Sequence, residues 1–255
     1  MHLEPFAEGK SFIHSLDPRV KILGLLPFIV TVAVSKNLNT PALALMAGIF
    51  LVGLSRLNFS ALISRLYVVN LFILLLWLIM PFAVPGRELF SAGPLCATKE
   101  GVFYALIITL KANAIFLSTI ALIGTVPLFK LTHALHHLGM NEKLSLLFFF
   151  CYRYITVLHR DYHALYGAVK ARAFTPGNSL RTYKTYGWLI GMLLVKSYEH
   201  SQKMYEAMLC RGFCGRFPVL NHFKTEKKDY FFLAAMLSIT VFILMFEKSV
   251  FTAML

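Results

Sequence analysis

Residues 66–84 form an apolar stretch without a single charged side chain. A helix of about 20 such residues is long enough to cross the hydrocarbon core of a bilayer. The composition of the whole chain indicates that this helix lies in a membrane and is not the buried core helix of a soluble protein. Hydrophobic residues make up 58% of the chain and charged residues 15%, whereas about 25% of a soluble domain is charged. The sequence therefore predicts an integral membrane protein.

Four further apolar segments accompany this stretch: 22–34, 41–54, 101–126 and 230–246. The first two are shorter than the roughly 20 residues that a span needs, so we expect a tight hairpin of short or tilted spans. The polar residues before them lack the basic start and the small-residue cleavage site of a signal peptide, so the first segment is expected to stay in the membrane. Together the segments predict an all-α fold with about five transmembrane helices.

A helix start is predicted just before the first span. Asp17 suits the N-cap position and Pro18 the first turn. Arg19 and Lys21 follow, and we expect both to lie at the membrane surface as anchors.

A basic block between two span-containing regions gives the predicted domain division: 1–129, 130–228 and 229–255. The block holds fifteen of the 25 lysines and arginines. Its segments 152–173 and 196–211 are amphipathic, which predicts helices that lie at the membrane surface or against a partner. A short apolar helix is predicted between them.

The distribution of basic residues predicts the orientation. With the N-terminus inside and five spans, inner segments hold twenty lysines and arginines and outer segments hold four. This positive-inside bias predicts an inner-membrane protein with a cytoplasmic N-terminus, a cytoplasmic basic block and an external C-terminus. Nucleic-acid binding, the other common reason for a net charge of +13, is disfavoured because few segments could carry a basic face outside the bilayer.

One heptapeptide pattern occurs twice. Residues 168–174 read Ala-Val-Lys-Ala-Arg-Ala-Phe, and residues 207–213 read Ala-Met-Leu-Cys-Arg-Gly-Phe. Arg172 and Arg211 each extend the apolar stripe of an amphipathic helix rather than its polar face. A guanidinium binds carboxylates bidentately and stays charged when partly desolvated, so the pattern predicts docking to a partner. Compensation of the helix dipole explains one arginine but not the recurring small residues and phenylalanine.

Three stretches carry a family resemblance: Leu-Asp-Pro-Arg-Val-Lys (16–21), Ala-Arg-Ala-Phe (171–174), and 207–213 with Gly215 after it. They resemble the transmembrane (T) component of energy-coupling factor (ECF) transporters over essentially the full chain. The Arg-Gly-Phe ending followed by Gly-Arg-Phe-Pro is similar to the cobalt/nickel branch (CbiQ/NikQ type), since vitamin-type relatives tend to show Arg-Gly-Tyr. Cys210 stands where an alanine is more usual and keeps the small size.

The resemblance implies a non-catalytic scaffold that joins a substrate-binding (S) membrane subunit to two cytoplasmic ABC-type ATPases. ATP would be bound by the ATPases and Co²⁺ or Ni²⁺ by the S subunit, with no cofactor or metal on this chain. The resemblance also implies two ATPase-coupling motifs, which consist of Ala171, Arg172, Ala173, Phe174, Cys210, Arg211, Gly212 and Phe213. It implies an N-terminal motif at the membrane interface, which consists of Asp17, Pro18 and Arg19.

Three alternatives remain open. One is a T component for a vitamin. Another is a membrane metalloenzyme that uses the histidines at 133, 136 and 137 or at 159 and 163. Their spacings place imidazoles on one helix face, but surface histidines without a metal are the favoured interpretation. The third is a self-sufficient carrier with Lys111, a lysine inside a predicted span. No nucleotide-binding motif is present.

Overall fold

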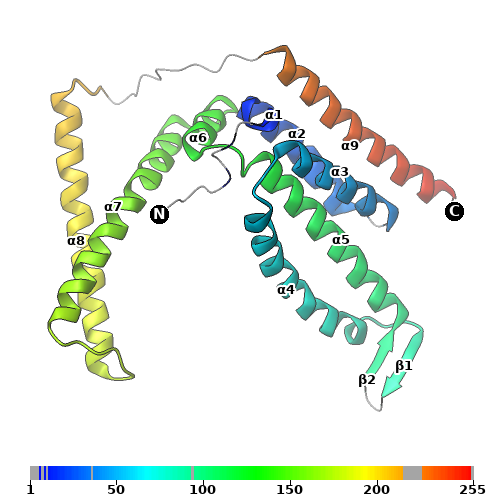
Figure 1. Cartoon of the computed structure of the whole chain (residues 1–255), viewed down its shortest axis with the longest axis horizontal. Coiled ribbons are helices and arrows are strands. Elements are labelled where there is room, and N and C mark those ends of the chain that lie inside the picture. Colours follow the sequence, from blue (N-terminus) through cyan, green and yellow to red (C-terminus); the bar gives the residue numbers. More distant parts are fainter. Residues whose placement is uncertain are drawn as a thin grey trace. The chain divides into compact units, whose positions relative to one another are not determined.

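The computed structural model describes residues 6, 9, 11–35, 37–92, 95–214 and 226–253, with side chains except in 88–97 and 248–253. Gly215 and the Arg-Phe-Pro after it lie outside the described residues. The chain divides into two compact units (Figure 1): residues 1–138 with 223–255, and residues 139–222.

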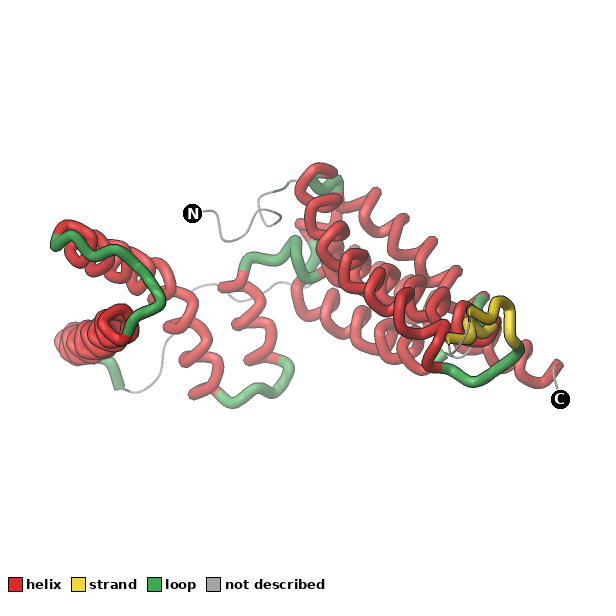
Figure 2. The backbone as a smooth tube through the Cα atoms, turned by 90° about the horizontal axis from the view of Figure 1, so that it is seen from below, coloured by secondary structure: helices red, strands yellow, loops and turns green. Residues whose placement is uncertain are grey.

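The first unit contains most of the secondary structure. In chain order its elements are α1 (Phe12–Ser15), α2 (Pro18–Val34), α3 (Asn39–Ser55), α4 (Phe59–Ala83), β1 (Glu88–Ala92), β2 (Leu95–Thr98), α5 (Lys99–Leu122), α6 (Leu128–His137) and α9 (Lys227–Ala253). Figure 2 shows that most of the described backbone is helical. The antiparallel pair β1–β2, with Ala92 opposite Leu95, was not predicted.

Three helices in the described part of the chain have the length and apolar composition of membrane spans: α4, α5 and residues 227–247 of α9. The helix α3 is apolar but shorter. Many large apolar side chains of α4 are exposed, among them Phe72, Leu74 and Leu78. Such a surface is unfavourable in water and suits lipid. The predicted class, a helical integral membrane protein, is confirmed.

The helices of the first unit meet through small residues. α3 packs mainly against α5, where a Cβ on Gly48 would come within 3.1 Å of Ser118 Oγ. α2 packs mainly against α9, where a Cβ on Gly24 would come within 3.3 Å of Met236. α2 and α3, the first two apolar segments, are joined by the short connection 35–38 and also contact each other, but each packs mainly against another helix.

Polar side chains inside the spans bind one another or the backbone. The amides of Asn70 on α4 and Asn113 on α5 exchange two hydrogen bonds of 3.2 and 3.1 Å. Lys111 donates to the carbonyl oxygen of Ala33 at 2.8 Å. Polar side chains need hydrogen-bond partners of this kind in a low-dielectric interior.

The second unit is an antiparallel pair of long helices, α7 (Glu142–Ala171) and α8 (Leu180–Cys210). Helix α7 begins ten residues before the predicted segment 152–173. Helix α8 runs without interruption through the two segments that the sequence separated, 186–195 and 196–211. Apolar residues surround the first half of α8 more evenly than the second, and the two segments were predicted separately for this reason.

Candidate functional site at the ends of the α7–α8 hairpin

The first arginine motif forms the end of α7. Arg172 is the C-cap residue, with φ −88° and ψ 24°. Ala173 follows in the left-handed region, with φ 57°. Its N–H donates to the carbonyl of Lys170 at 3.1 Å. This bond is one of the two that define a Schellman helix end.

The second motif ends α8 in the same way. Arg211 is the C-cap, and Gly212 follows with φ 78°. The N–H of Gly212 donates to Leu209 O at 2.9 Å, and the N–H of Phe213 donates to Met208 O at 3.1 Å. These two bonds make a complete Schellman motif.

The shared helix end explains most of the repeated pattern. The residue after each arginine is left-handed, a conformation that Gly212 adopts without strain and that the Cβ of Ala173 makes less favourable. The residue after it, Phe174 or Phe213, is in each case half-buried, as the apolar contact of a Schellman end requires. Gly212 at the end of an amphipathic pattern predicts a helix stop, but sequence reasoning did not recognise that both motifs end their helices in this way. Capping does not explain the arginines.

Arg172 borders an apolar cavity of about 480 Å³ between the two helices. Leu165, Val169 and Phe174 line it from α7 and the α7 end, and Trp188 and Leu189 line it from α8. The arginine thus lies on the apolar side of its helix, as its spacing from Val169 predicted. At the other end of the hairpin, Met208 lines a second apolar cavity of about 360 Å³ together with α7 residues such as Leu158.

The two arginines lie at opposite ends of the hairpin. Arg172 shares its cavity with Arg181 and Thr185 at the start of α8, and Arg211 caps the end of the same helix. With a rise of 1.5 Å per residue, the 26 to 30 residues between them correspond to about 40 Å. One compact binding site cannot contact both.

The hairpin is strongly basic. Residues 139–214 contain ten lysines and arginines against four aspartates and glutamates. Within the described part of the chain, the three ion pairs use Lys196, His200 and Lys228, and neither Arg172 nor Arg211. Both arginines are exposed, so their charges are available to a partner.

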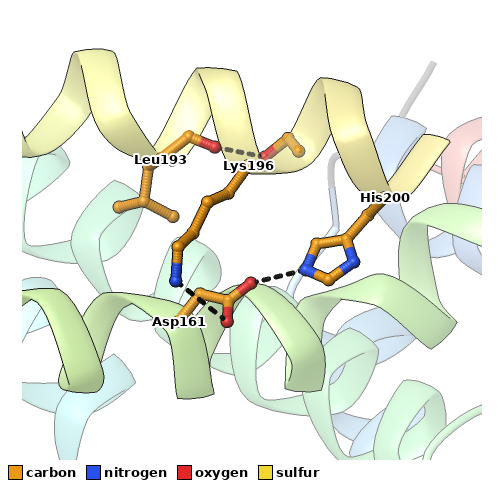
Figure 3. A network of polar contacts seen from close by, with 5 residues as sticks. Asp161, Leu193, Lys196 and His200 are labelled. Carbon is orange, nitrogen blue, oxygen red and sulfur yellow. Dashed lines mark hydrogen bonds and ion pairs between the residues drawn. The ribbon is translucent and has the colours of Figure 1, made fainter. Parts of the chain in front are cut away.

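A half-buried carboxylate joins the middles of the two helices (Figure 3). Asp161 of α7 accepts a hydrogen bond from His200 Nε2 at 2.9 Å and lies 3.9 Å from Lys196 Nζ. Its side chain is only 13% exposed. Sequence reasoning could not find His200 as the partner of Asp161, because His200 lies 39 residues further along the chain.

The N-terminal motif occupies the first unit. Asp17 caps α2 as predicted, accepting a 3.0 Å hydrogen bond from the N–H of Arg19, and Pro18 is the first helical residue. The expectation of a surface anchor at Lys21 is wrong. Lys21 is fully buried, and its Nζ donates to Thr125 Oγ1 at 3.2 Å. Two acidic groups near it, Asp17 and Asp229, explain how the protein holds this amine inside.

Burial also changes the basicity of this lysine, which precedes the apolar stretch 22–34. Desolvation and the nearby Lys130 lower the pKa of Lys21 from 10.5 to about 8, against the smaller opposing effects of Asp229 and Asp17. No local pattern signals this burial, because a lysine beside an arginine before an apolar run is usually an interfacial residue.

The histidines do not form a metal centre with other ligand types. Among the described residues, no group of three or more His, Cys, Asp or Glu side chains is placed to hold an ion. His133 and His137 are in edge-to-face contact, with ring centroids 4.6 Å apart. His159 and His163 form a separate pair on α7, with ring centroids 4.4 Å apart.

These features define a class: a helical membrane protein with several spans that carries a basic, amphipathic helical hairpin ending twice in an exposed arginine. The chain belongs to the CbiQ family, described as cobalt transport protein, whose pattern matches residues 9–223. The predicted resemblance to ECF transporter T components is thereby confirmed at the level of the family.

Relatives place the chain in the same group. It is 28% identical over 228 residues to the energy-coupling factor transporter transmembrane protein EcfT of Streptococcus equi subsp. equi, covering 82% of each chain. It is 27% identical to EcfT of Bacillus subtilis, over 84% of this chain and 85% of the relative. An uncharacterized protein of Methanocaldococcus jannaschii, MJ1571, is 26% identical over 97% of this chain and 87% of its own length.

Proposed function

We propose that this chain is the scaffold and coupling subunit of an ATP-driven importer for cobalt or nickel ions. In this proposal the α7–α8 hairpin lies in the cytoplasm and docks onto two ABC-type ATPases. A separate S subunit binds the ion, and the chain itself is not catalytic. The positive-inside distribution of lysine and arginine supports the orientation, with the N-terminus inside and the C-terminus outside.

The observation that carries the proposal is the placement of Arg172 and Arg211. Both are exposed and absent from the ion pairs of the described residues, and Arg172 borders the apolar cavity between α7 and α8. About 40 Å separates them along α8, which suits two separate binding sites on two copies of a partner. We assign to each arginine a pairing with a carboxylate on one ATPase, next to an apolar contact by Phe174 or Phe213.

Coupling requires that movement of the ATPases be transmitted through the hairpin. The ion pair of Asp161 with Lys196 and His200 joins the two helices near their middles. Closure of the ATPase pair would therefore move α7 and α8 together rather than separately. The choice of cobalt or nickel over a vitamin rests on the family description and on the Arg-Gly-Phe ending of the second motif.

The docking assignment is tested with the purified complex of this chain, both ATPases and the S subunit. Arg172→Glu together with Arg211→Glu should abolish copurification of the ATPases, because each change places like charges together at a docking site. Arg160→Glu is the matched control, since Arg160 is exposed on α7 away from the helix end. Survival of the complex and of its transport-coupled ATP hydrolysis in the double variant would show that the assignment is wrong.

The substrate is tested separately by uptake of labelled cobalt or nickel into proteoliposomes that contain the whole complex. Metal uptake that needs ATP and every subunit is the expected result. Flux through this chain alone would favour the self-sufficient carrier, and vitamin uptake without metal uptake would favour the vitamin-type alternative.

A further inference from the structure

Two histidines on α7 direct the same ring nitrogen at each other. His159 Nε2 lies 3.1 Å from His163 Nε2, and the ring planes are inclined by 81°. The residues are one helical turn apart, and both side chains are exposed. Two nitrogens at this distance share one proton or bind one ion.

The distance agrees with binding to one metal ion. Imidazole nitrogens bind ions such as Zn²⁺ at about 2.0–2.1 Å. Two nitrogens on one ion, at angles between square and tetrahedral, are therefore about 2.8–3.4 Å apart. The observed 3.1 Å lies within this range, so the backbone of α7 already holds the two nitrogens at a chelating distance.

The pair is also accessible within its unit. Asp161 points toward α8, where it contacts Lys196 and His200 (Figure 3). His159 and His163 are each two positions from Asp161, which corresponds to about 200° around a helix. Both histidines therefore project from the side of α7 that faces away from α8.

We propose that His159 and His163 form a bidentate site for a late first-row divalent ion, with water in the remaining positions. Neutral imidazoles suit Co²⁺, Ni²⁺, Cu²⁺ and Zn²⁺, and Cu²⁺ is expected to bind most tightly. Binding needs both Nε2 atoms without a proton, so the N–H of each neutral ring must lie on Nδ1, and protons compete with the ion. The site is separate from the arginine motifs and does not rest on the proposed transport function.

The test uses the full chain, purified in detergent without a polyhistidine tag and titrated with Ni²⁺ by calorimetry. His159→Ala and His163→Ala should each lower the affinity of the tightest site at least tenfold, because one imidazole loses the chelate. His200→Ala is the matched control, since His200 is bound to Asp161 on the other side of the hairpin, and it should leave the affinity unchanged.

A rescue variant separates chelation from a general effect on α7. His159→Ala with Gly167→His moves the pair one turn along the helix, to positions 163 and 167. Gly167 has open space around it, so the histidine fits, and Ni²⁺ affinity should return. Cu²⁺ bound to the unaltered chain should show two equivalent nitrogen ligands in its electron paramagnetic resonance spectrum. No saturable Ni²⁺ binding, or equal binding by both single variants and the unaltered chain, would overturn the proposal.

Discussion

The backbone N–H of Asp17 donates a 2.9 Å hydrogen bond to Oδ1 of Asp229, a residue 212 positions later in the chain. The other oxygen of Asp229 accepts from the N–H of Glu226 at 2.8 Å. One buried carboxylate thus caps α9 and holds the start of α2 beside it. Helices α2 and α9 are joined at this point by a polar contact as well as by apolar packing.

Loss of this carboxylate should destabilise the first unit. Asp229→Ala is expected to lower the free energy of unfolding by about 2–3 kcal/mol, because the N–H of Asp17 loses a charged acceptor. Asp229→Asn keeps one acceptor oxygen and should cost less. Denaturant titration in detergent micelles measures both, and Glu226→Gln, a change at an exposed side chain, is the control. Equal stability of Asp229→Ala and the unaltered chain would contradict this account.

The buried amine of Lys21 predicts how stability depends on pH. Its pKa is about 8 in the folded protein, against an ordinary value of 10.5 when the chain is unfolded, so between these values the unfolded chain binds more protons. Stability should therefore rise as the pH is raised from about 8 to 10.5. Lys21→Met removes the titrating group and should flatten this part of the profile. Thermal unfolding of both proteins, measured from about pH 7 to 10.5, tests the prediction. Parallel profiles of melting temperature against pH would contradict it.

The sequence predicted the apolar helices well and the contacts between distant elements poorly. Stretches such as 66–84 are visible because an uncharged apolar run has few alternatives to a span. The N-cap at Asp17 was visible because capping is local. The burial of Lys21 depends on Thr125 and Asp229, and no local pattern places those residues beside it. The partner of Asp161 was hidden for the same reason.

The conformations of the two helix ends predict that removing a methyl group at Ala173 and adding one at Gly212 have opposite effects on stability. Ala173 has φ 57° and Gly212 has φ 78°. Ala173→Gly should stabilise the hairpin by about 0.5–1 kcal/mol, because a left-handed L-residue is strained by more than glycine loses in unfolded-state entropy. Gly212→Ala should destabilise it by a similar amount. The melting temperature of the purified chain measures both, and shifts of the same sign would show that the helix ends differ from this description.

The separation of the arginines predicts independent effects. Arg172→Glu and Arg211→Glu should each weaken binding of the ATPases, and the free-energy losses should add to within about 0.5 kcal/mol because the sites share no neighbours. A double-mutant cycle on the dissociation constant of the complex is the measurement. Strong coupling between the two changes would indicate a single shared site.

The carboxylate of Asp161 should set how closely α7 and α8 stay together. Asp161→Ala removes the acceptor of His200 and the partner of Lys196, and it should broaden the distance distribution between spin labels on the two helices. Lys196→Ala should have a smaller effect, because its 3.9 Å contact is longer and its side chain is 35% exposed. Unchanged distributions in Asp161→Ala would leave apolar packing as the cause of the pairing.

The helix ends also bear on how distant relatives are compared. The small residue and the phenylalanine after each arginine belong to a way of ending helices that unrelated proteins use as well. Matches at those positions carry little information about coupling. Arg172 and Arg211 are the positions that helix termination leaves unexplained, so agreement at these two residues discriminates a shared mechanism from a shared way of stopping a helix.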